Sequence, residues 1–268
     1  MKEIMKPETI KLVIFDWAGT TIDHGCFAPI SAFIKAFKAC GVDLTPQQAR
    51  GPMGLHKQDH IRSLFQLDEI AAQWKSLHQR DWTEADVKHI YETFMPLQIE
   101  EAKLFTDLVP DLCETISILR DQGIKIGSTT GYPRIVADPV LEAARAQGYA
   151  PDFSMCADEV PAGRPAPWMI YRNMEALGVF PPSAVVKVGD TVPDVEAGLN
   201  AGTWTVGLTQ TGSEVGLTVA EFAALSDEQK ADRLAIAETK LKNAGAHFVI
   251  PTLQGLPDII EQLNAKEN

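Results

Sequence analysis

The sequence lacks the patterns typical of zinc sites, disulfide-rich folds and membrane spans. No two of its four cysteines have the C-x-x-C spacing; they are Cys26, Cys40, Cys113 and Cys156. A metal-binding cysteine cluster or a disulfide framework is therefore not indicated. No apolar run approaches the roughly 18 residues of a transmembrane helix, and the first residues, MKEIMKPETIK, carry charges throughout. We therefore expect a soluble protein of the cytoplasm.

An excess of positive charge is also absent. The net charge is −12 at pH 7, which argues against a nucleic-acid partner. An acidic surface repels anionic substrates as well, so a phosphate-binding site in this chain must gather its own cations. The chain has 268 residues, of which 45% are hydrophobic, and this is enough for one large α/β domain or for a core with a smaller second domain.

Six short apolar runs predict β-strands, and helical stretches follow them. The runs are residues 11–16, 124–131, 152–158, 185–190, 203–208 and 247–250. Runs that are apolar on both faces are typical of a parallel sheet covered by helices, and the spacing of the later runs matches β-α-β units. The pattern predicts an α/β fold with a Rossmann-like core, in which helices flank a parallel β-sheet.

The stretch between the first two runs indicates helices and no strand. Residues 31–41, 58–82 and 84–105 repeat apolar side chains at helical intervals, as do residues 226–245 near the C-terminus. We predict an all-helical cap domain over residues 22–102, inserted into an α/β core formed by residues 1–21 and 103–268. Parallel sheets bind ligands at the carboxyl ends of their strands, so a cap attached there would close over the site.

Polar side chains follow four of the predicted strands. In chain order they are Asp16, Thr130 with Gly131, Arg164, and Asp190 with Asp194. Each has an ordinary structural explanation when taken alone, since an aspartate after a strand often closes a turn or caps a helix. Their common position at one edge of the sheet instead indicates a single site.

These residue types match phosphoryl transfer. Asp16 can attack phosphorus and form an aspartyl phosphate. The Thr130 hydroxyl, the Gly131 N–H and the Arg164 guanidinium can hold the phosphoryl oxygens.

The acidic residues predict a magnesium site. Asp16, Asp190 and Asp194 supply the hard oxygen ligands that Mg²⁺ prefers, and a cation would let the carboxylates lie close together. Ala18 stands two residues after Asp16, where enzymes that cleave phosphate esters commonly have a second acid. Ala18 can offer the metal its backbone carbonyl, but it cannot protonate a leaving group.

The chain resembles the haloacid dehalogenase-like hydrolase superfamily in the order of these four motifs. Within the superfamily it is similar to the phosphonatases, a family of phosphonoacetaldehyde hydrolases. The segments that carry the resemblance are FDWAGTTIDHGCFAP, PMGLHKQDH, GIKIGSTTGY, VPAGRPAPWM and KVGDTVPD. The resemblance covers nearly the whole chain. It implies a helical cap, Mg²⁺ dependence, a homodimer and a small phosphonate substrate.

The resemblance also implies the reaction, which is cleavage of the P–C bond of phosphonoacetaldehyde to acetaldehyde and phosphate during 2-aminoethylphosphonate degradation. The family's motif makes Lys57 the amine that forms an imine, or Schiff base, with the aldehyde, and the iminium then accepts the electrons of the P–C bond. The segment GPMGL precedes Lys57, and we expect Lys57 to open a helix, whose dipole lowers the pKa of the amine.

Further roles rest on the resemblance alone. It favours His60 over His56 as the group that moves protons beside the lysine. It also places four residues around the substrate, namely Met53, Gly54, Cys26 and Tyr132. Packing between cap and core would account for these four residues equally well.

Three alternatives remain open. Haloacid dehalogenases that work without a metal also lack the second acid. A general phosphatase of the superfamily is disfavoured by Ala18. A binding protein without catalysis would be a decayed hydrolase, and the loss of one catalytic acid is an early step in such decay.

Overall fold

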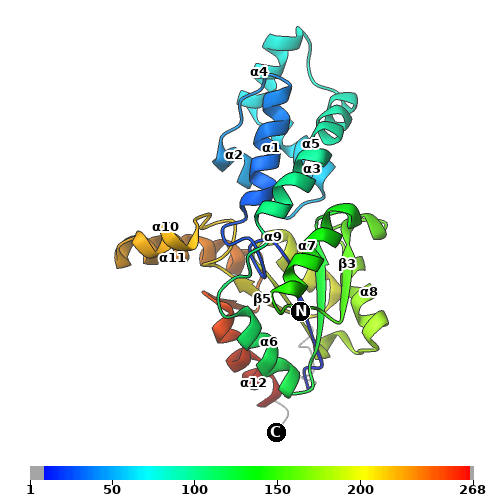
Figure 1. Cartoon of the computed structure of the whole chain (residues 1–268), viewed down its shortest axis with the longest axis vertical. Coiled ribbons are helices and arrows are strands. Elements are labelled where there is room, and N and C mark those ends of the chain that lie inside the picture. The colour runs from blue at the N-terminus through cyan, green and yellow to red at the C-terminus, as the bar shows by residue number, and fades with distance from the viewer. Residues whose placement is uncertain (1–8, 266–268) are drawn as a thin grey trace.

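A six-stranded parallel sheet forms the centre of the structure, a computed structural model that describes residues 9–265 (Figure 1). The strand order is β3-β2-β1-β4-β5-β6, and all neighbouring pairs are parallel. The strands are β1 (Leu12–Phe15), β2 (Lys125–Thr130), β3 (Phe153–Cys156), β4 (Val185–Gly189), β5 (Trp204–Leu208) and β6 (Phe248–Ile250). The predicted α/β core and its parallel sheet are therefore confirmed.

The strand order reverses at β1, which lies between β2 and β4. The last residue of β1, Phe15, is in register with Ser128 of β2 and with Val188 of β4. The three strands therefore end side by side, and the residues that follow them meet at this edge. A reversal of strand order is the usual position of a ligand site in such sheets.

Two hydrophobic layers cover the sheet because alternate side chains of a strand point to opposite faces. Val13 and Phe15 belong to one buried cluster, whereas Leu12 and Ile14 belong to another. The helices of these layers are α6 (Leu112–Asp121), α7 (Arg134–Ala146), α8 (Trp168–Leu177), α9 (Val192–Ala201), α11 (Asp227–Asn243) and α12 (Leu256–Ala265). The short helix α10 (Val219–Ala224) instead shares a separate hydrophobic cluster with α11. The helix predicted near the C-terminus corresponds to α11.

Five helices gather at the upper end of the molecule in Figure 1 and have a hydrophobic core of their own. They are α1 (Phe27–Ala39), α2 (Pro46–Arg50), α3 (Lys57–Phe65), α4 (Asp68–His78) and α5 (Glu84–Leu104). Stacked aromatic rings fill this core, with the rings of Phe33 and Phe94 4.3 Å apart. We call these five helices the cap; the domain boundaries at residues 22 and 102 stay a prediction. Within the described residues, no helix is long and apolar enough to span a membrane.

The first connection from the core to the cap is a tight turn. Asp23, Gly25 and Cys26 all have left-handed backbone conformations, with φ of 53°, 91° and 58°. The Asp23 carboxylate accepts the backbone N–H groups of Phe27 at 2.8 Å and of Ala28 at 2.9 Å. These bonds satisfy free donors of the first turn of α1, so Asp23 fixes the direction in which the cap begins.

Candidate active site

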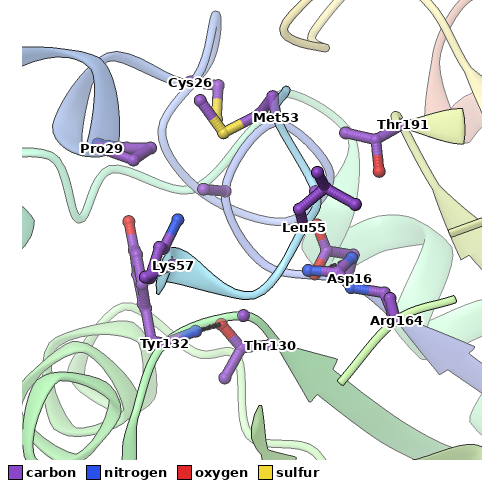
Figure 2. Close-up of a pocket in the computed structure, with 13 residues that line it drawn as sticks. Asp16, Cys26, Pro29, Met53, Leu55, Lys57, Thr130, Tyr132, Arg164 and Thr191 are labelled. Carbon is purple, nitrogen blue, oxygen red and sulfur yellow. Dashed lines mark hydrogen bonds and ion pairs between the residues drawn. The ribbon is translucent and has the colours of Figure 1, made fainter. Parts of the chain in front are cut away.

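A pocket lies where the cap meets the carboxyl end of the sheet, and Figure 2 shows the side chains around it. The space between its lining atoms, including the part that is open to solvent, is about 340 Å³. Ten of the predicted site residues line it: Asp16, Ala18, Cys26, Met53, Gly54, Lys57, Thr130, Gly131, Tyr132 and Arg164. The structure therefore brings the segments that follow β1 and β3, the end of β2, and the cap to one cavity.

Asp16 follows β1 and is only 5% exposed. Its backbone N–H donates to the Val188 carbonyl at 3.0 Å, which ties the residue to β4. Arg164 Nη1 lies 2.9 Å from Asp16 Oδ1. Burial raises the pKa of Asp16, and this effect exceeds the opposing attraction of Arg164. A cation at the site would restore the ionised, nucleophilic form.

Three carboxylates lie together beside the pocket. Asp16, Asp190 and Asp194 each offer an oxygen atom, and these atoms all lie within 4.8 Å of one another. Burial, together with the neighbouring carboxylates of Asp16 and Asp194, raises the pKa of Asp190 to about 7. Like charges this close disfavour ionisation of the whole group, and a divalent cation would relieve the repulsion.

The three carboxylates differ in how many of their oxygens are already occupied. Asp194 binds Arg164, Lys187 and the Thr191 hydroxyl. Burial alone would raise the pKa of Asp194, but Arg164 and Lys187 lower it to about 2. Asp16 has the Arg164 ion pair and otherwise faces the pocket. The hard oxygen donors therefore fit a divalent metal, with Asp16 freer than Asp194 to bind it directly.

Asp190 is held in place by two donors. The Thr20 hydroxyl donates to Oδ1 at 3.1 Å, and the backbone N–H of Ser213 donates to Oδ2 at 2.8 Å. Gly19 gives the carboxylate room, because a Cβ atom at position 19 would lie 2.6 Å from Asp190 Oδ2. The orientation of this carboxylate is thus set by the segment after β5 as well as by the turn after β1.

Lys57 is the first residue of α3 and is 5% exposed. Its Nζ lies 5.5 Å from the centre of the Phe33 ring and 5.7 Å from that of Tyr132, beside which it stands in Figure 2. Burial lowers the pKa of Lys57 to about 8. The predicted helix start is confirmed, but removal from water, more than the helix dipole, accounts for this pKa.

His60 lies one turn beyond Lys57 and is completely buried. Its Nε2 lies 2.9 Å from the Ala49 carbonyl, which can only accept, so Nε2 carries the proton. Nδ1 then holds a lone pair, and it has no hydrogen-bond partner in the part of the chain that the structure describes. The ring stacks on Phe33, with centroids 3.9 Å apart, and burial lowers the pKa of His60 well below its usual value. His60 does not line the pocket.

His56 lies just before α3 and is less buried than His60. It is the residue that precedes the first turn of α3, and its side chain makes no capping hydrogen bond. It is partly buried, and burial lowers its pKa. It is also absent from the pocket lining.

Free hydrogen-bond donors point to an anion in the pocket. Thr130 Oγ1 accepts the Tyr132 N–H at 3.1 Å, so its own hydroxyl hydrogen is left to donate. Arg164 is 7% exposed, and its Nε has no partner among the described residues. A buried donor without a partner is costly, so a bound oxyanion would be stabilised by both groups.

The cap packs directly on the core at Gly54. This glycine has φ of 95°, and a Cβ atom there would lie 2.5 Å from Thr191 Oγ1. Any other residue would force the loop that carries Met53 and Gly54 away from the core. The close approach explains why a glycine stands at the pocket wall.

Sequence reasoning missed four residues of this region. Pro29, Leu55 and Thr191 also line the pocket. Lys187 is 1% exposed, and its Nζ lies 2.7 Å from Asp194 Oδ1. A signal for Lys187 was present, because it interrupts the otherwise apolar strand segment VVKVG. For the other three residues no sequence signal distinguishes pocket lining from ordinary packing.

Comparisons with known proteins agree with this architecture. A family model described as haloacid dehalogenase-like hydrolase matches residues 10–202. The phosphonoacetaldehyde hydrolase of Syntrophobacter fumaroxidans is 45% identical over 97% of this chain and 94% of its own length. A bifunctional phosphonoacetaldehyde hydrolase/aminoethylphosphonate transaminase of Clostridioides difficile is 48% identical over 94% of this chain, which spans only 40% of that protein.

A solved structure shows the same fold over the whole chain. The crystal structure of a phosphonoacetaldehyde hydrolase-like protein from Oleispira antarctica has a TM-score of 0.96 and 38% sequence identity. The match covers 99% of this chain and 96% of the other, so it includes the cap helices as well as the sheet.

Proposed function

The chain belongs to the haloacid dehalogenase-like hydrolase family, and we propose that it cleaves the P–C bond of phosphonoacetaldehyde to give acetaldehyde and phosphate. One observation carries this proposal. A buried lysine of low pKa, Lys57, faces the same small pocket as the carboxylate of Asp16, and Ala18 stands beside them. Relatives named phosphonoacetaldehyde hydrolase, 45% identical over nearly the full chain, support it.

Ala18 is the reason to favour a phosphonate over a phosphate ester. An ester releases an alkoxide, which an acid near the nucleophile normally protonates. A phosphonate would release a carbanion, a much poorer leaving group, and the remedy is to delocalise its electrons into an iminium. Ala18 cannot supply the acid, whereas Lys57 can supply the iminium.

Lys57 begins the proposed reaction as a neutral amine. Its pKa of about 8 leaves a useful neutral fraction near pH 7. The amine adds to the aldehyde carbon, and loss of water gives the imine, which is protonated on nitrogen. Helix geometry places His60 next to Lys57 on α3, and its Nδ1, which has no hydrogen-bond partner among residues 9–265, would accept a proton in this step.

Asp16 then attacks phosphorus in line with the P–C bond. An O–P bond forms as the P–C bond breaks, and the electron pair moves into the iminium to give an enamine on Lys57. The enamine takes a proton at carbon and is hydrolysed to acetaldehyde, and water hydrolyses the aspartyl phosphate. Thr130, Gly131 and Arg164 would hold the phosphoryl oxygens throughout.

We propose Mg²⁺ as the divalent cation of the acidic cluster. Asp16, the backbone carbonyl of Ala18 and Asp190 would bind it directly, while Asp194 mainly holds the cations Arg164 and Lys187. When bound, Mg²⁺ would neutralise charge on the phosphonate as Asp16 approaches.

The pocket lining, the assembly, the location and the metabolic role complete the proposal. Cys26, Met53, Gly54 and Tyr132 line the pocket, and their contact with substrate stays a prediction. The homodimer and the cytoplasmic location also stay predictions. Participation in 2-aminoethylphosphonate degradation is supported by the transaminase half of the bifunctional relative.

Reductive trapping tests the proposed function directly. The enzyme is incubated with phosphonoacetaldehyde and Mg²⁺, quenched with borohydride and mapped by peptide mass spectrometry. We expect a two-carbon adduct on Lys57 together with release of phosphate.

Four other outcomes would favour a different reaction or function. Release of phosphate without an adduct on Lys57 would contradict the imine. Chelator-insensitive halide release from a 2-haloacid would favour a dehalogenase, and hydrolysis of an aryl phosphate at a similar rate would favour a phosphatase. Ligand binding without turnover would favour a non-catalytic protein.

A further inference from the structure

Arg50 is a residue of the cap, and the carbonyl groups that its side chain binds within the described residues all lie outside the cap. It is the last residue of α2, and it donates to the carbonyls of Gly25, Ser213 and Gly216, the last two at 3.2 and 3.3 Å. Its guanidinium also lies 5.1 Å from the centre of the Phe27 ring. One side chain thus joins the cap, the turn that leads into it, and the core segment after β5.

That core segment, residues 209–217, is called here the β5 loop. It also binds the turns around the nucleophile. The Thr211 hydroxyl donates to the Gly19 carbonyl at 2.6 Å, and the Gly25 N–H donates to the Thr211 carbonyl at 2.8 Å. The Ser213 N–H donates to Asp190 Oδ2 at 2.8 Å. The segment that Arg50 holds through Ser213 is therefore the one that orients Asp190.

The β5 loop packs closely against both Arg50 and Asp190. A Cβ atom at position 216 would lie 2.8 Å from Arg50 Cζ, and one at position 212 would lie 2.7 Å from Asp190 Cβ. Gly212 and Gly216 therefore let the β5 loop fit between the guanidinium on one side and the Asp190 carboxylate on the other.

We propose that Arg50 is a positioning residue that couples closure of the cap to the orientation of the Asp190 carboxylate, acting through the backbone of Ser213. Arg50 lines neither the pocket nor the acidic cluster. When the cap rests on the core, the guanidinium fixes the β5 loop, and the Ser213 N–H holds Asp190 toward Asp16. When the cap lifts, the bonds from Arg50 to the loop are lost together. The expected effect of Arg50 on turnover of phosphonoacetaldehyde rests on the proposed function, whereas the coupling between Arg50 and Asp190 does not.

Arginine suits this role because its planar fork presents several donors at fixed angles to separate acceptors. A lysine at this position keeps the positive charge, but its compact ammonium cannot reproduce the spread of the fork. Arg50→Lys and Arg50→Gln therefore separate the geometry of the contact from its charge.

The test measures Mg²⁺ binding by calorimetry and hydrogen exchange across the whole chain. In Arg50→Gln we expect Mg²⁺ affinity to fall about tenfold, as for other groups that orient metal ligands, and exchange of residues 209–217 to increase. If Arg50 acted only through its positive charge, its removal would relieve repulsion of Mg²⁺ and strengthen Mg²⁺ binding. A weaker affinity in Arg50→Gln therefore supports the positioning role, and a stronger affinity contradicts it. Arg50→Lys should weaken Mg²⁺ binding less than Arg50→Gln.

A matched control removes a different cap cation. Lys38 pairs with Asp43 at the surface of the cap, and Lys38→Gln should change neither Mg²⁺ affinity nor exchange in the β5 loop. Urea unfolding identifies any variant that fails to fold, in which case Arg50→Lys carries the test. Where phosphonoacetaldehyde is turned over, excess Mg²⁺ should restore much of the kcat of Arg50→Gln, which a general loss of stability would not allow.

The outcomes keep the two proposals apart. If Arg50→Gln weakens Mg²⁺ binding but the wild type does not cleave phosphonoacetaldehyde, the coupling stands and the proposed function fails. Unchanged or tighter Mg²⁺ binding in Arg50→Gln overturns the coupling whatever the substrate is. If no protein binds Mg²⁺, hydrogen exchange decides, and an unchanged β5 loop overturns it.

Discussion

Lys187 and Asp194 form an ion pair in which both side chains are 1% exposed and Nζ lies 2.7 Å from Oδ1. The same Asp194 carboxylate binds Arg164, whose Nη1 lies 2.9 Å from Oδ1 of Asp16, the proposed nucleophile. A chain of alternating charges therefore runs from the interior of the sheet to the pocket. Asp194 is therefore paired with two buried cations, and one of them, Arg164, also pairs with Asp16 at the pocket.

Lys187→Met should destabilise the protein by about 3 kcal/mol, because removing one partner of a buried pair leaves the other charge uncompensated. Urea unfolding measures the loss. In the double variant Lys187→Met with Asp194→Asn, the loss should be clearly smaller than the sum of the two single losses. Additive losses would mean that the two side chains do not stabilise each other.

The pKa of Lys57 should set the pH dependence of the proposed imine formation. Burial lowers this pKa to about 8, and only the neutral amine can form the imine. The rate of imine formation should therefore rise about tenfold per pH unit below pH 8 and level off above it. Borohydride trapping after short reaction times measures the rate of imine formation, over a range of about two pH units on either side of the Lys57 pKa. A rise that continues to about pH 10, the usual lysine value, would contradict the role of burial.

Lys57→Arg keeps a positive charge at the start of α3 but cannot form an imine. Release of phosphate from phosphonoacetaldehyde should fall by several orders of magnitude, because no iminium then accepts the electrons of the P–C bond. A phosphate assay measures the loss, and circular dichroism checks that the variant is folded. Substantial remaining activity would mean that P–C cleavage does not need the imine.

The sheet could be predicted from sequence because short, mostly apolar runs mark its strands, and the polar residues that follow these runs, such as Asp16 and Asp190, mark the edge where the candidate site lies. The cap could be predicted as helical because apolar residues recur at helical intervals. These are local patterns, and they do not depend on which distant segments meet.

Contacts between distant segments could not be predicted in this way. Nothing near Arg50 in the sequence indicates that it reaches Ser213 and Gly216, because that contact arises only when the cap rests on the core. The sequence likewise gives no sign that His60 is fully buried with Nε2 donating to the Ala49 carbonyl, and its role in moving protons stays a prediction. The burial that sets the pKa of Lys57 is likewise a property of the closed cavity.

Ala18→Asp tests why this position carries no acid. A new carboxylate in the pocket that holds Lys57 would favour the ammonium form and raise its pKa above 8. Imine formation at pH 7 should fall about tenfold for each unit by which the pKa rises, and the pH profile should move upward. Ala18→Asn, which adds similar bulk without charge, should leave the midpoint in place. Equal effects of the two variants would point to steric blockage.

Removal of the metal separates the proposed hydrolase from a dehalogenase. Asp16 and Asp190 lie in a cluster of three buried carboxylates, and burial, together with the neighbouring Asp194 carboxylate, raises the pKa of Asp16 and so favours its protonated form when no cation is bound. A chelator should therefore stop phosphate release, and added Mg²⁺ should restore it. Imine trapping on Lys57 should persist at a reduced level, because that step needs the amine and the aldehyde but not the attack by Asp16. Phosphate release that continues unchanged in chelator would contradict a metal-dependent nucleophile.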